Sequence, residues 1–195
     1  MIAVVKYDAG NVRSVLNALD RAGARDVVLT SDPDLLRSAS KVILPGVGEA
    51  STALDSLRKE GLDSIIPTLE NPVLGICIGL QLLCRESEEG NVRGMGVFPA
   101  CVRRFVPDGE IKVPHMGWNS LTSLEGPLFD GIDDGTYFYF VHSYRADICD
   151  CTAAVCDHGG PFSAALCRGN FYGVQFHPEK SGAAGEKVIK NFLGL

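Results

Sequence analysis

The pattern of apolar and polar residues divides the 195-residue chain into two parts of different character. In the first part, short apolar runs alternate with segments whose apolar residues recur at helical spacing. These patterns predict strands at 2–6, 27–29, 41–44 and 73–76, and helices at 11–21, at 51–60 and in a short stretch before Pro67. Strands that alternate with helices are typical of a parallel sheet with helices on both faces.

The second part of the chain is richer in strands. Its apolar runs predict strands at 96–105, 137–141, 152–156, 163–168 and 171–176, followed by a closing helix at 183–193. Glycine-containing turns at 159–161 and 168–170 favour hairpins between neighbouring strands. The chain has no internal repeat, low-complexity segment or linker, so the sequence predicts one α/β domain that spans residues 1–195.

The first candidate for chemistry is Cys77, which directly follows the apolar run at 73–76. Gly75 and Gly79 flank it, and a helical pattern comes next. This arrangement is typical of the strand-to-helix elbow that carries the nucleophile in G-x-S-x-G enzymes, with Cys in place of Ser. The glycines allow a sharp turn, and the start of the following helix favours the thiolate. On this motif alone, a buried Cys between two ordinary glycines is an equally good interpretation.

A second motif, His177-Pro178-Glu179, follows the predicted strand at 171–176. Proline restricts its own backbone and that of the preceding residue, so the motif can hold an imidazole and a carboxylate close together. Taken separately, the histidine is more simply structural and the glutamate a solvated turn residue. A thiol nucleophile needs a base, however, and the base needs an orienting acceptor, so Cys77, His177 and Glu179 together predict a catalytic triad. His142 is an alternative base, but it lacks a carboxylate two residues away behind a proline.

Composition and charge exclude several classes of protein. The net charge is −6 without a basic run, so nucleic acid and anionic membranes are poor partners. No apolar stretch reaches the ~20 residues that a transmembrane helix needs, and the first residues do not resemble a signal peptide. Seven cysteines, an odd number, predict reduced thiols and a cytoplasmic location. The spacing of Cys149, Cys151 and Cys156 fits no common zinc motif, so we expect no metal site there.

Two further segments suggest parts of a site for amide hydrolysis. Pro45-Gly46-Val47-Gly48 follows the predicted strand at 41–44, at the sheet edge where ligands bind in open α/β folds. Its glycines permit conformations in which an amide points into the site, although a plain strand-to-helix turn could have the same sequence. The amide of Ile78 is another candidate donor to an oxyanion. Gln81 lies one helical turn after Cys77 and can face the same way, although a surface glutamine is the simpler interpretation.

Several blocks of sequence carry a family resemblance. They are Tyr7-Asp8-Ala9-Gly10-Asn11-Val12-Arg13-Ser14-Val15, Leu44-Pro45-Gly46-Val47-Gly48, Gly75-Ile76-Cys77-Ile78-Gly79-Leu80-Gln81, Lys112-Val113-Pro114-His115-Met116-Gly117-Trp118-Asn119, Phe140-Val141-His142-Ser143-Tyr144 and the segment 173–182. With these blocks the chain resembles the class I, triad-type glutamine amidotransferases and, among them, the glutaminase subunits of imidazole glycerol phosphate synthase. The resemblance spans nearly the whole chain. Glu49-Ala50 departs from it, because small and aromatic residues usually stand there.

The resemblance implies a flavodoxin-like three-layer α/β/α fold with a central mixed, mostly parallel sheet. It also implies three groups of site residues: an oxyanion hole at Val47, Gly48 and Ile78, substrate contacts at Gln81, Ser143 and Tyr144, and a partner surface at Trp118, Asn119, Tyr139 and Lys180. Without the resemblance, Trp118 beside Gly117 is more simply a core residue next to a glycine turn.

The resemblance further implies an activity and a partner. Cys77 would attack the side-chain amide of L-glutamine, and the resulting glutamyl thioester would be hydrolysed without a metal or organic cofactor. The ammonia would pass to a separate (β/α)₈-barrel cyclase subunit in a heterodimer. That subunit would form imidazole glycerol phosphate and an aminoimidazole carboxamide ribotide in histidine biosynthesis. We expect the cyclase on another chain, because 195 residues hold no second domain of that size.

Two other functions remain open at this point. One is a triad glutaminase that serves a different synthesis, such as that of anthranilate or pyridoxal phosphate, although the block Pro114-His115-Met116-Gly117-Trp118-Asn119 disfavours it. The other is a relative on the same fold that is no amidotransferase, either a cysteine peptidase or a binding module with an idle Cys77. Glutamine hydrolysis and co-purification with a cyclase would discriminate among them.

Overall fold

The candidate nucleophile follows a strand in the parallel part of a large mixed sheet. The computed structural model describes residues 1–8, 12–107, 109 and 111–195. Parallel strands follow one another in the order β2 (Val27–Thr30), β1 (Ile2–Val5), β3 (Lys41–Leu44), β4 (Val73–Ile76) and β13 (Phe171–Val174). Because their carboxyl ends meet at the same edge, the residues that follow β3, β4 and β13 lie near one another.

Past β13 the sheet continues through strands of mixed direction. β12 (Pro161–Arg168), β10 (Tyr144–Ala146) and β7 (Phe98–Arg104) pair antiparallel in turn, and β11 (Thr152–Asp157) adds to β12. β5 (Cys84–Ser87) pairs parallel with β7 and antiparallel with β6 (Val92–Arg93). A separate two-stranded sheet joins β8 (His115–Ser120) to β9 (Tyr137–His142). The predicted mixed sheet is confirmed.

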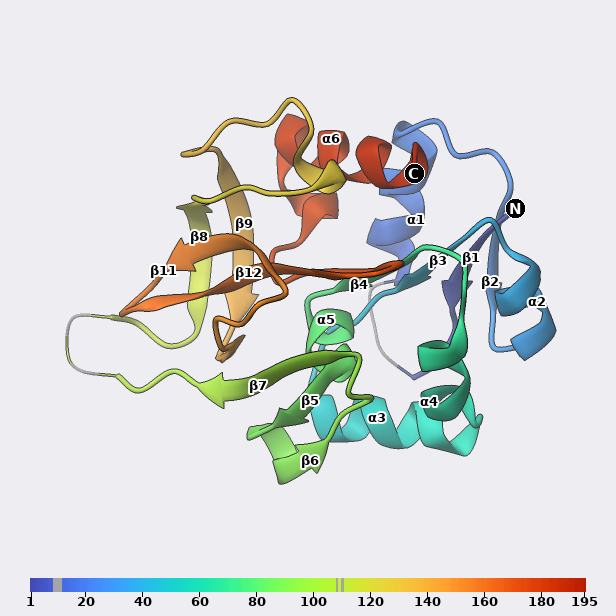
Figure 1. The fold of residues 1–195 in the computed structure, drawn as a ribbon, viewed down its shortest axis with the longest axis horizontal. Coiled ribbons are helices and arrows are strands. Elements are labelled where there is room, and N and C mark those ends of the chain that lie inside the picture. The colour runs from blue at the N-terminus through green and yellow to red at the C-terminus, as the bar shows by residue number, and fades with distance from the viewer. Residues whose placement is uncertain (9–11, 108, 110) are drawn as a thin grey trace.

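Helices cover both faces of the main sheet (Figure 1). α1 (Val12–Arg21) and α6 (Gly182–Leu193) lie on one side, and α3 (Ala50–Lys59), α4 (Leu62–Ile65) and α5 (Ile78–Leu83) lie on the other. α2 (Pro33–Ser38) lies beside β1 and β2. Short 3₁₀ turns complete the elements: η1 (Ile66–Thr68), η2 (Glu89–Asn91), η3 (Pro127–Phe129) and η4 (Pro178–Lys180). The predicted start of the first helix, Asn11, lies outside the described residues.

Several short elements were not predicted from the sequence pattern, namely α2, β5, β6, β8 and β10. α2 has local start signals, because the Asp32 carboxylate accepts a hydrogen bond from Asp34 N at 2.9 Å and Pro33 occupies the first turn. β8 runs straight through Gly117, where a turn was expected. Gly117 has a φ of 125° but keeps its place in the ladder opposite Phe140. The strands were missed because runs this short show little periodicity.

A buried cluster of aromatic and histidine side chains packs between the two sheets. His115 and His142 lie opposite each other in the β8–β9 ladder and are 4% and 7% exposed. Nδ1 of His115 lies 2.9 Å from Nε2 of His142, and the His115 ring stacks on Phe140 and on His158. Burial lowers the pKa of His115 to about 4 and that of His142 to about 3, so both rings are neutral near pH 7.

Two glycines let α5 pack directly onto neighbouring backbone. A Cβ on Gly79 would lie 2.0 Å from the carbonyl oxygen of Leu44 at the end of β3. A Cβ on Gly75 would lie 2.7 Å from the carbonyl carbon of Gly79. Neither glycine has a positive φ, so space rather than backbone conformation requires glycine at both positions.

We expect Gly79→Ala to lower the free energy of unfolding by roughly 1–3 kcal/mol or more, because the added methyl group collides with backbone inside the sheet. Urea unfolding followed by circular dichroism measures this change. Gly194→Ala is a matched control, because its Cβ would meet no atom closer than 3.4 Å, and it should change stability by less than about 0.5 kcal/mol. Equal stabilities of the two variants would contradict the packing argument.

The neutral pair His115 and His142 predicts a loss of stability in acid. Their folded-state pKa values, about 4 and about 3, lie below the ordinary 6.5. At a pH between these values, the unfolded chain therefore binds more protons than the folded chain. The stability that the two neutral histidines contribute to the folded state is fully present above pH 6.5. As the pH falls toward 4, the free energy of unfolding decreases by roughly 1.4 kcal/mol per pH unit for each histidine. Urea unfolding across this range should show a flatter pH dependence for a His115→Asn/His142→Asn double variant. Parallel curves for the two proteins would refute the assignment.

Candidate active site

Cys77 occupies a strained turn between β4 and α5. Its φ of 53° and ψ of −106° are rare for a residue with a side chain. The turn is held by hydrogen bonds from Cys77 N to Val174 O at 2.8 Å and from Gln81 N to Cys77 O at 3.2 Å. The residue is buried, at the carboxyl edge of the parallel strands. The geometry is that of the elbow expected from the flanking glycines.

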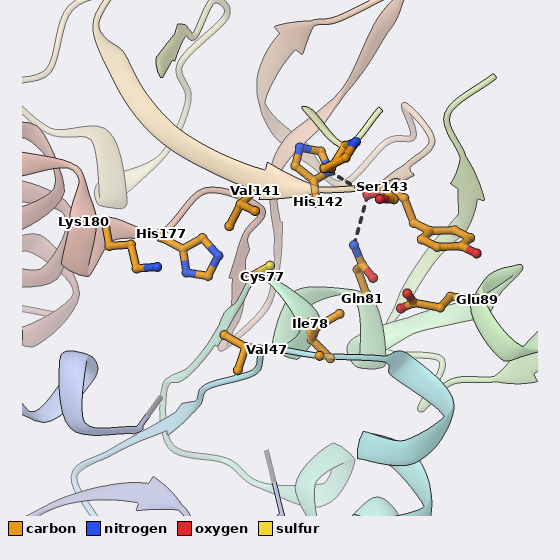
Figure 2. Close-up of a pocket in the computed structure, with 13 residues that line it drawn as sticks. Val47, Cys77, Ile78, Gln81, Glu89, Val141, His142, Ser143, His177 and Lys180 are labelled. Atoms are coloured by element: carbon orange, nitrogen blue, oxygen red, sulfur yellow. Dashed lines mark hydrogen bonds between the residues drawn. The ribbon is translucent and has the colours of Figure 1, made fainter. Parts of the chain in front are cut away.

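His177 lies beside Cys77, just past the end of β13 (Figure 2). Its Nδ1 lies 2.8 Å from Oε1 of Glu179, and these two side chains are only 1% and 3% exposed. The backbone of His177 is fixed on both sides, because its N–H donates to Tyr139 O at 2.9 Å and its carbonyl accepts from Ser181 Oγ at 2.7 Å. Nε2 of His177 is buried and makes no standard hydrogen bond within the part of the chain that the structure describes.

The surroundings of His177 favour a protonated imidazole next to the sulfur. Burial alone would lower the pKa of His177, but its interactions with Cys77 and Glu179 outweigh burial and raise the pKa to about 10. A carboxylate at Nδ1 fixes the ring orientation and leaves Nε2 to exchange a proton with the thiol. The fold thus brings Cys77, after β4, beside the His177–Glu179 pair, after β13, in the order expected for a nucleophile, a base and an orienting acceptor.

A cavity of ≈ 510 Å³ opens above Cys77. The predicted residues that line it are Val47, Gly48, Cys77, Ile78, Gln81, Ser143, Tyr144, His177 and Lys180, together with the alternative base His142. The amide of Ile78 stands at the first position of α5, where no carbonyl of the helix can accept from it. Gly48 has a φ of 99°, and the hydroxyl of Tyr7 donates to the carbonyl of Pro45 at the start of the same loop. Both parts of the predicted oxyanion hole therefore border the cavity that holds the thiol.

The cavity also contains Glu89, Pro114 and Val141, to which the sequence analysis assigned no role. Glu89 lies in η2, and one of its carboxylate oxygens accepts a hydrogen bond from Ala50 N at 2.9 Å. This contact joins the cavity wall to the start of α3. The sequence around Glu89 matches no motif, so only the packing of η2 against α3 reveals it.

Gln81 is buried rather than on the surface. Its Nε2 donates to Tyr144 O at 3.1 Å and to Gln175 Oε1 at 3.0 Å. Its Oε1 is buried and has no hydrogen-bond partner among the described residues. Both N–H groups of the Gln81 amide are therefore used within the protein, and the amide oxygen is its one group left without a partner among the described residues.

His142, the alternative base, uses both ring nitrogens elsewhere. Nδ1 lies 2.7 Å from Tyr144 O, and Nε2 lies 2.9 Å from Nδ1 of His115. Neither nitrogen is left to exchange a proton with Cys77, which favours His177 as the base.

Three of the predicted interface residues gather at the surface. The rings of Trp118 and Tyr139 meet edge to face at 6.1 Å, and Lys180 Nζ lies 5.7 Å from the centre of the Tyr139 ring. Trp118 is 55% exposed, so it is not a core residue. The amide of Asn119 is directed away from this cluster, because its Nδ2 donates to Asp157 O at 2.8 Å.

The remaining cysteines do not join this site. Cys156 is buried, Cys149 and Cys151 are half-buried, and all seven cysteines are free thiols. Within residues 1–8, 12–107, 109 and 111–195, no group of three or more His, Cys, Asp or Glu side chains is arranged to hold a metal ion. None of the helices described above is long and apolar enough to span a membrane.

Comparison with known sequences finds relatives of the whole chain. Residues 4–194 match the family Glutamine amidotransferase class-I. The imidazole glycerol phosphate synthase subunit HisH of Bacteroides thetaiotaomicron is 54% identical over 195 residues, which cover 100% of this chain and 99% of the relative. The HisH subunit of Bacteroides fragilis is 55% identical with the same coverage, and that of Escherichia coli is 49% identical over 98% of this chain and 99% of its own length.

Solved structures agree with the fold. A glutamine amidotransferase superposes with a TM-score of 0.75 at 19% identity, over 99% of this chain and 97% of that one. Another glutamine amidotransferase, from Thermotoga maritima, gives a TM-score of 0.64 at 20% identity, over 99% of this chain and 82% of that one. At these identities the likeness shows the fold alone. The match to residues 4–194 and the full-length relatives show that the chain belongs to the class-I glutamine amidotransferase family, among the HisH subunits of imidazole glycerol phosphate synthase.

Proposed function

We propose that this chain is the glutaminase subunit of an imidazole glycerol phosphate synthase and that Cys77, His177 and Glu179 hydrolyse L-glutamine to glutamate and ammonia. The observation that carries the proposal is the buried His177–Glu179 pair beside the strained Cys77 elbow, on a cavity of amino-acid size. Residues 1–195 act as one amidotransferase domain, and the enzyme works in the cytoplasm.

The reaction proceeds in two steps through a covalent intermediate. His177 holds the proton of Cys77, and the thiolate attacks the side-chain carbonyl carbon of glutamine. The amide of Ile78 and an amide of the Val47–Gly48 segment bind the oxyanion. As the C–N bond breaks, Nε2 of His177 protonates the leaving nitrogen, which departs as ammonia and leaves a glutamyl thioester. His177 then takes a proton from water, whose attack releases glutamate and the thiolate, while Glu179 stabilises the imidazolium.

The other end of the substrate is recognised by the far wall of the cavity. The α-ammonium group of glutamine needs acceptors, and Gln81 Oε1 and the Glu89 carboxylate supply them. The backbone of Ser143 and Tyr144 lines the same wall and contacts the substrate. The buried acceptor on Gln81 supports this orientation, because an unpaired buried oxygen is costly until a donor arrives.

The ammonia is consumed on a partner chain. The HisH relatives are named as synthase subunits, which supports a partner subunit for this chain. We propose a (β/α)₈-barrel cyclase in a heterodimer, docked on the exposed cluster of Trp118, Tyr139 and Lys180. Exposed aromatic side chains of this kind are enriched at the centres of protein interfaces. Asn119 borders this surface from the inner face of β8, and Lys180 also lines the cavity.

Substitution of the triad tests the chemistry. Cys77→Ala should abolish glutamate release, measured with coupled glutamate dehydrogenase, and His177→Ala should lower kcat roughly 10²–10⁴-fold because it removes the proton carrier. Glu179→Ala should lower kcat less, because Glu179 orients the ring and transfers no proton. Cys167→Ala, at a half-buried thiol in β12, is the control and should retain full activity. Comparable activity of wild type and His177→Ala would contradict the assignment of His177 as the base.

Activation by the partner is a separate prediction. The free chain should be a poor glutaminase, because loss of one oxyanion donor in the Val47–Gly48 segment lowers the rate about 10²–10³-fold. Lys180→Ala should bind the cyclase normally but lose the stimulation, whereas Lys59→Ala, at an exposed lysine of α3, should behave as wild type. Steady-state kinetics with and without the cyclase measures both. A free wild-type chain as fast as the complex would rule this switch out.

A further inference from the structure

Gln175 is a buried polar side chain next to the nucleophile that the triad mechanism does not use. It directly follows β13 and is 0% exposed, and its backbone N–H donates to Ala164 O at 2.8 Å. Its side-chain Nε2 lies 3.6 Å from Sγ of Cys77, within the range of an N–H···S hydrogen bond. A fully buried amide is retained only where its hydrogen bonds are satisfied, so its orientation is informative.

The orientation of the Gln175 amide follows from the Tyr144 carbonyl, which can only accept. Nε2 of Gln81 lies 3.1 Å from that oxygen and must therefore donate to it. The second N–H of the same amide group donates to Oε1 of Gln175 at 3.0 Å. With its oxygen so engaged, Gln175 turns its NH₂ group toward the sulfur.

The Tyr144 carbonyl is itself held from the other side. His142 Nδ1 lies 2.7 Å from it and must carry a proton, so His142 Nε2 accepts from Nδ1 of His115 at 2.9 Å. Nε2 of His115 then accepts from Asn119 Nδ2 at 3.2 Å. Dashed lines in Figure 2 mark the hydrogen bonds from Gln81 and His142. Asn119, His115 and His142 thus donate in succession toward the Tyr144 carbonyl. Gln81 donates to the same carbonyl from the other side and also to Gln175, and His115 and His142 are uncharged.

We infer that Gln175 is a further catalytic residue, whose side-chain N–H donates to Sγ of Cys77 and stabilises the thiolate. The thiolate is the attacking group in the first step and the leaving group when water cleaves the thioester. The donor raises the fraction of thiol present as thiolate before the first step and stabilises the departing thiolate in the second. Gln81 is a positioning residue, because its N–H engages the Gln175 oxygen and so turns the Gln175 NH₂ group toward the sulfur. His142 and His115 only hold the Tyr144 carbonyl that Gln81 also contacts. The inference rests on the proposed function in taking Cys77 as the nucleophile.

The first test removes the donor. In Gln175→Met the pH midpoint for alkylation of Cys77 by iodoacetamide should move upward by roughly one to two units, the effect of one hydrogen bond to a charged group. Peptide mass spectrometry follows Cys77 separately from the other six thiols. In the complex with the cyclase, kcat should fall roughly 10- to 100-fold while KM for glutamine changes little, because the lost contact is to the enzyme's own sulfur.

Asn170→Leu is the matched control at the opposite end of β13. The Asn170 side chain donates to Leu69 O at 2.7 Å and to Asn71 O at 2.9 Å, so its loss destabilises the strand without touching the site. It should lower the melting temperature and leave the alkylation midpoint in place. If Gln175→Met behaved in the same way, Gln175 would be only a structural residue and the inference would be wrong.

Gln175→Glu is a second variant, whose side chain has the same shape as that of glutamine. It keeps the test informative if Gln175→Met does not fold. An ionised carboxylate cannot donate and repels the thiolate, whereas a protonated one can donate. Turnover of this variant, relative to wild type, should therefore fall as the pH rises. The titratable groups nearest the sulfur are His177, with Glu179 behind it, and Tyr7. Glu89, His142 and Lys180 line the same cavity, and both variants retain all of these groups. The difference from wild type therefore reports on residue 175.

Two results would overturn the inference: an unmoved alkylation midpoint in Gln175→Met, or a Gln175→Glu variant whose pH profile follows wild type. Failure of the proposed function has a different signature. In that case the wild-type complex would release no glutamate from glutamine, while the alkylation midpoint would still report whether Gln175 donates to Cys77.

Discussion

The contact on which the rest of the site depends is the backbone-to-backbone packing of α5 on the ends of β3 and β4. Gly79 brings the first turn of α5 against the Leu44 carbonyl, and Gly75 leaves room for that turn above β4. Only this close approach allows the chain to reverse at Cys77 with a positive φ. The same packing places the amide of Ile78 and the side chain of Gln81 around the thiol. A larger side chain at either glycine would move all of these groups together.

A second constraint is that the groups around the thiol are buried and polar at once. His177, Glu179, Gln81 and Gln175 are all shielded from water, so each must be oriented by protein partners. Among these four buried side chains, charge lies on His177 and Glu179, where Glu179 and the sulfur favour the imidazolium. The side chains that link Asn119 to Cys77 are neutral instead, because burial disfavours charge on His115 and His142. This division keeps the proton at His177, where the proposed reaction needs it.

The sequence by itself determined the ingredients of this protein. The alternation of apolar runs and helical patterns identified the parallel strands and the elbow, because buried strands and amphipathic helices have distinct periods. The glycines around Cys77 and the stiff His177-Pro178-Glu179 motif predicted the proposed triad, since both are local patterns. The family resemblance supplied Val47, Ser143, Tyr144 and the surface residues, which no local pattern would have singled out.

Only the tertiary structure decided which polar groups meet. Glu89 reaches the cavity because η2 packs on the start of α3, and Gln175 reaches the sulfur because β13 lies next to β4. Asn119 is next to Trp118 in the sequence, but alternation along β8 directs its amide to His115 and Asp157 and the Trp118 ring to Tyr139. The contacts of Glu89, Gln175 and Asp157 join residues tens of positions apart. The donor directions of Gln81 and His142 follow from a single carbonyl, Tyr144 O. Residue spacing carries no record of these pairings, because strand order and register arise only when the whole sheet assembles.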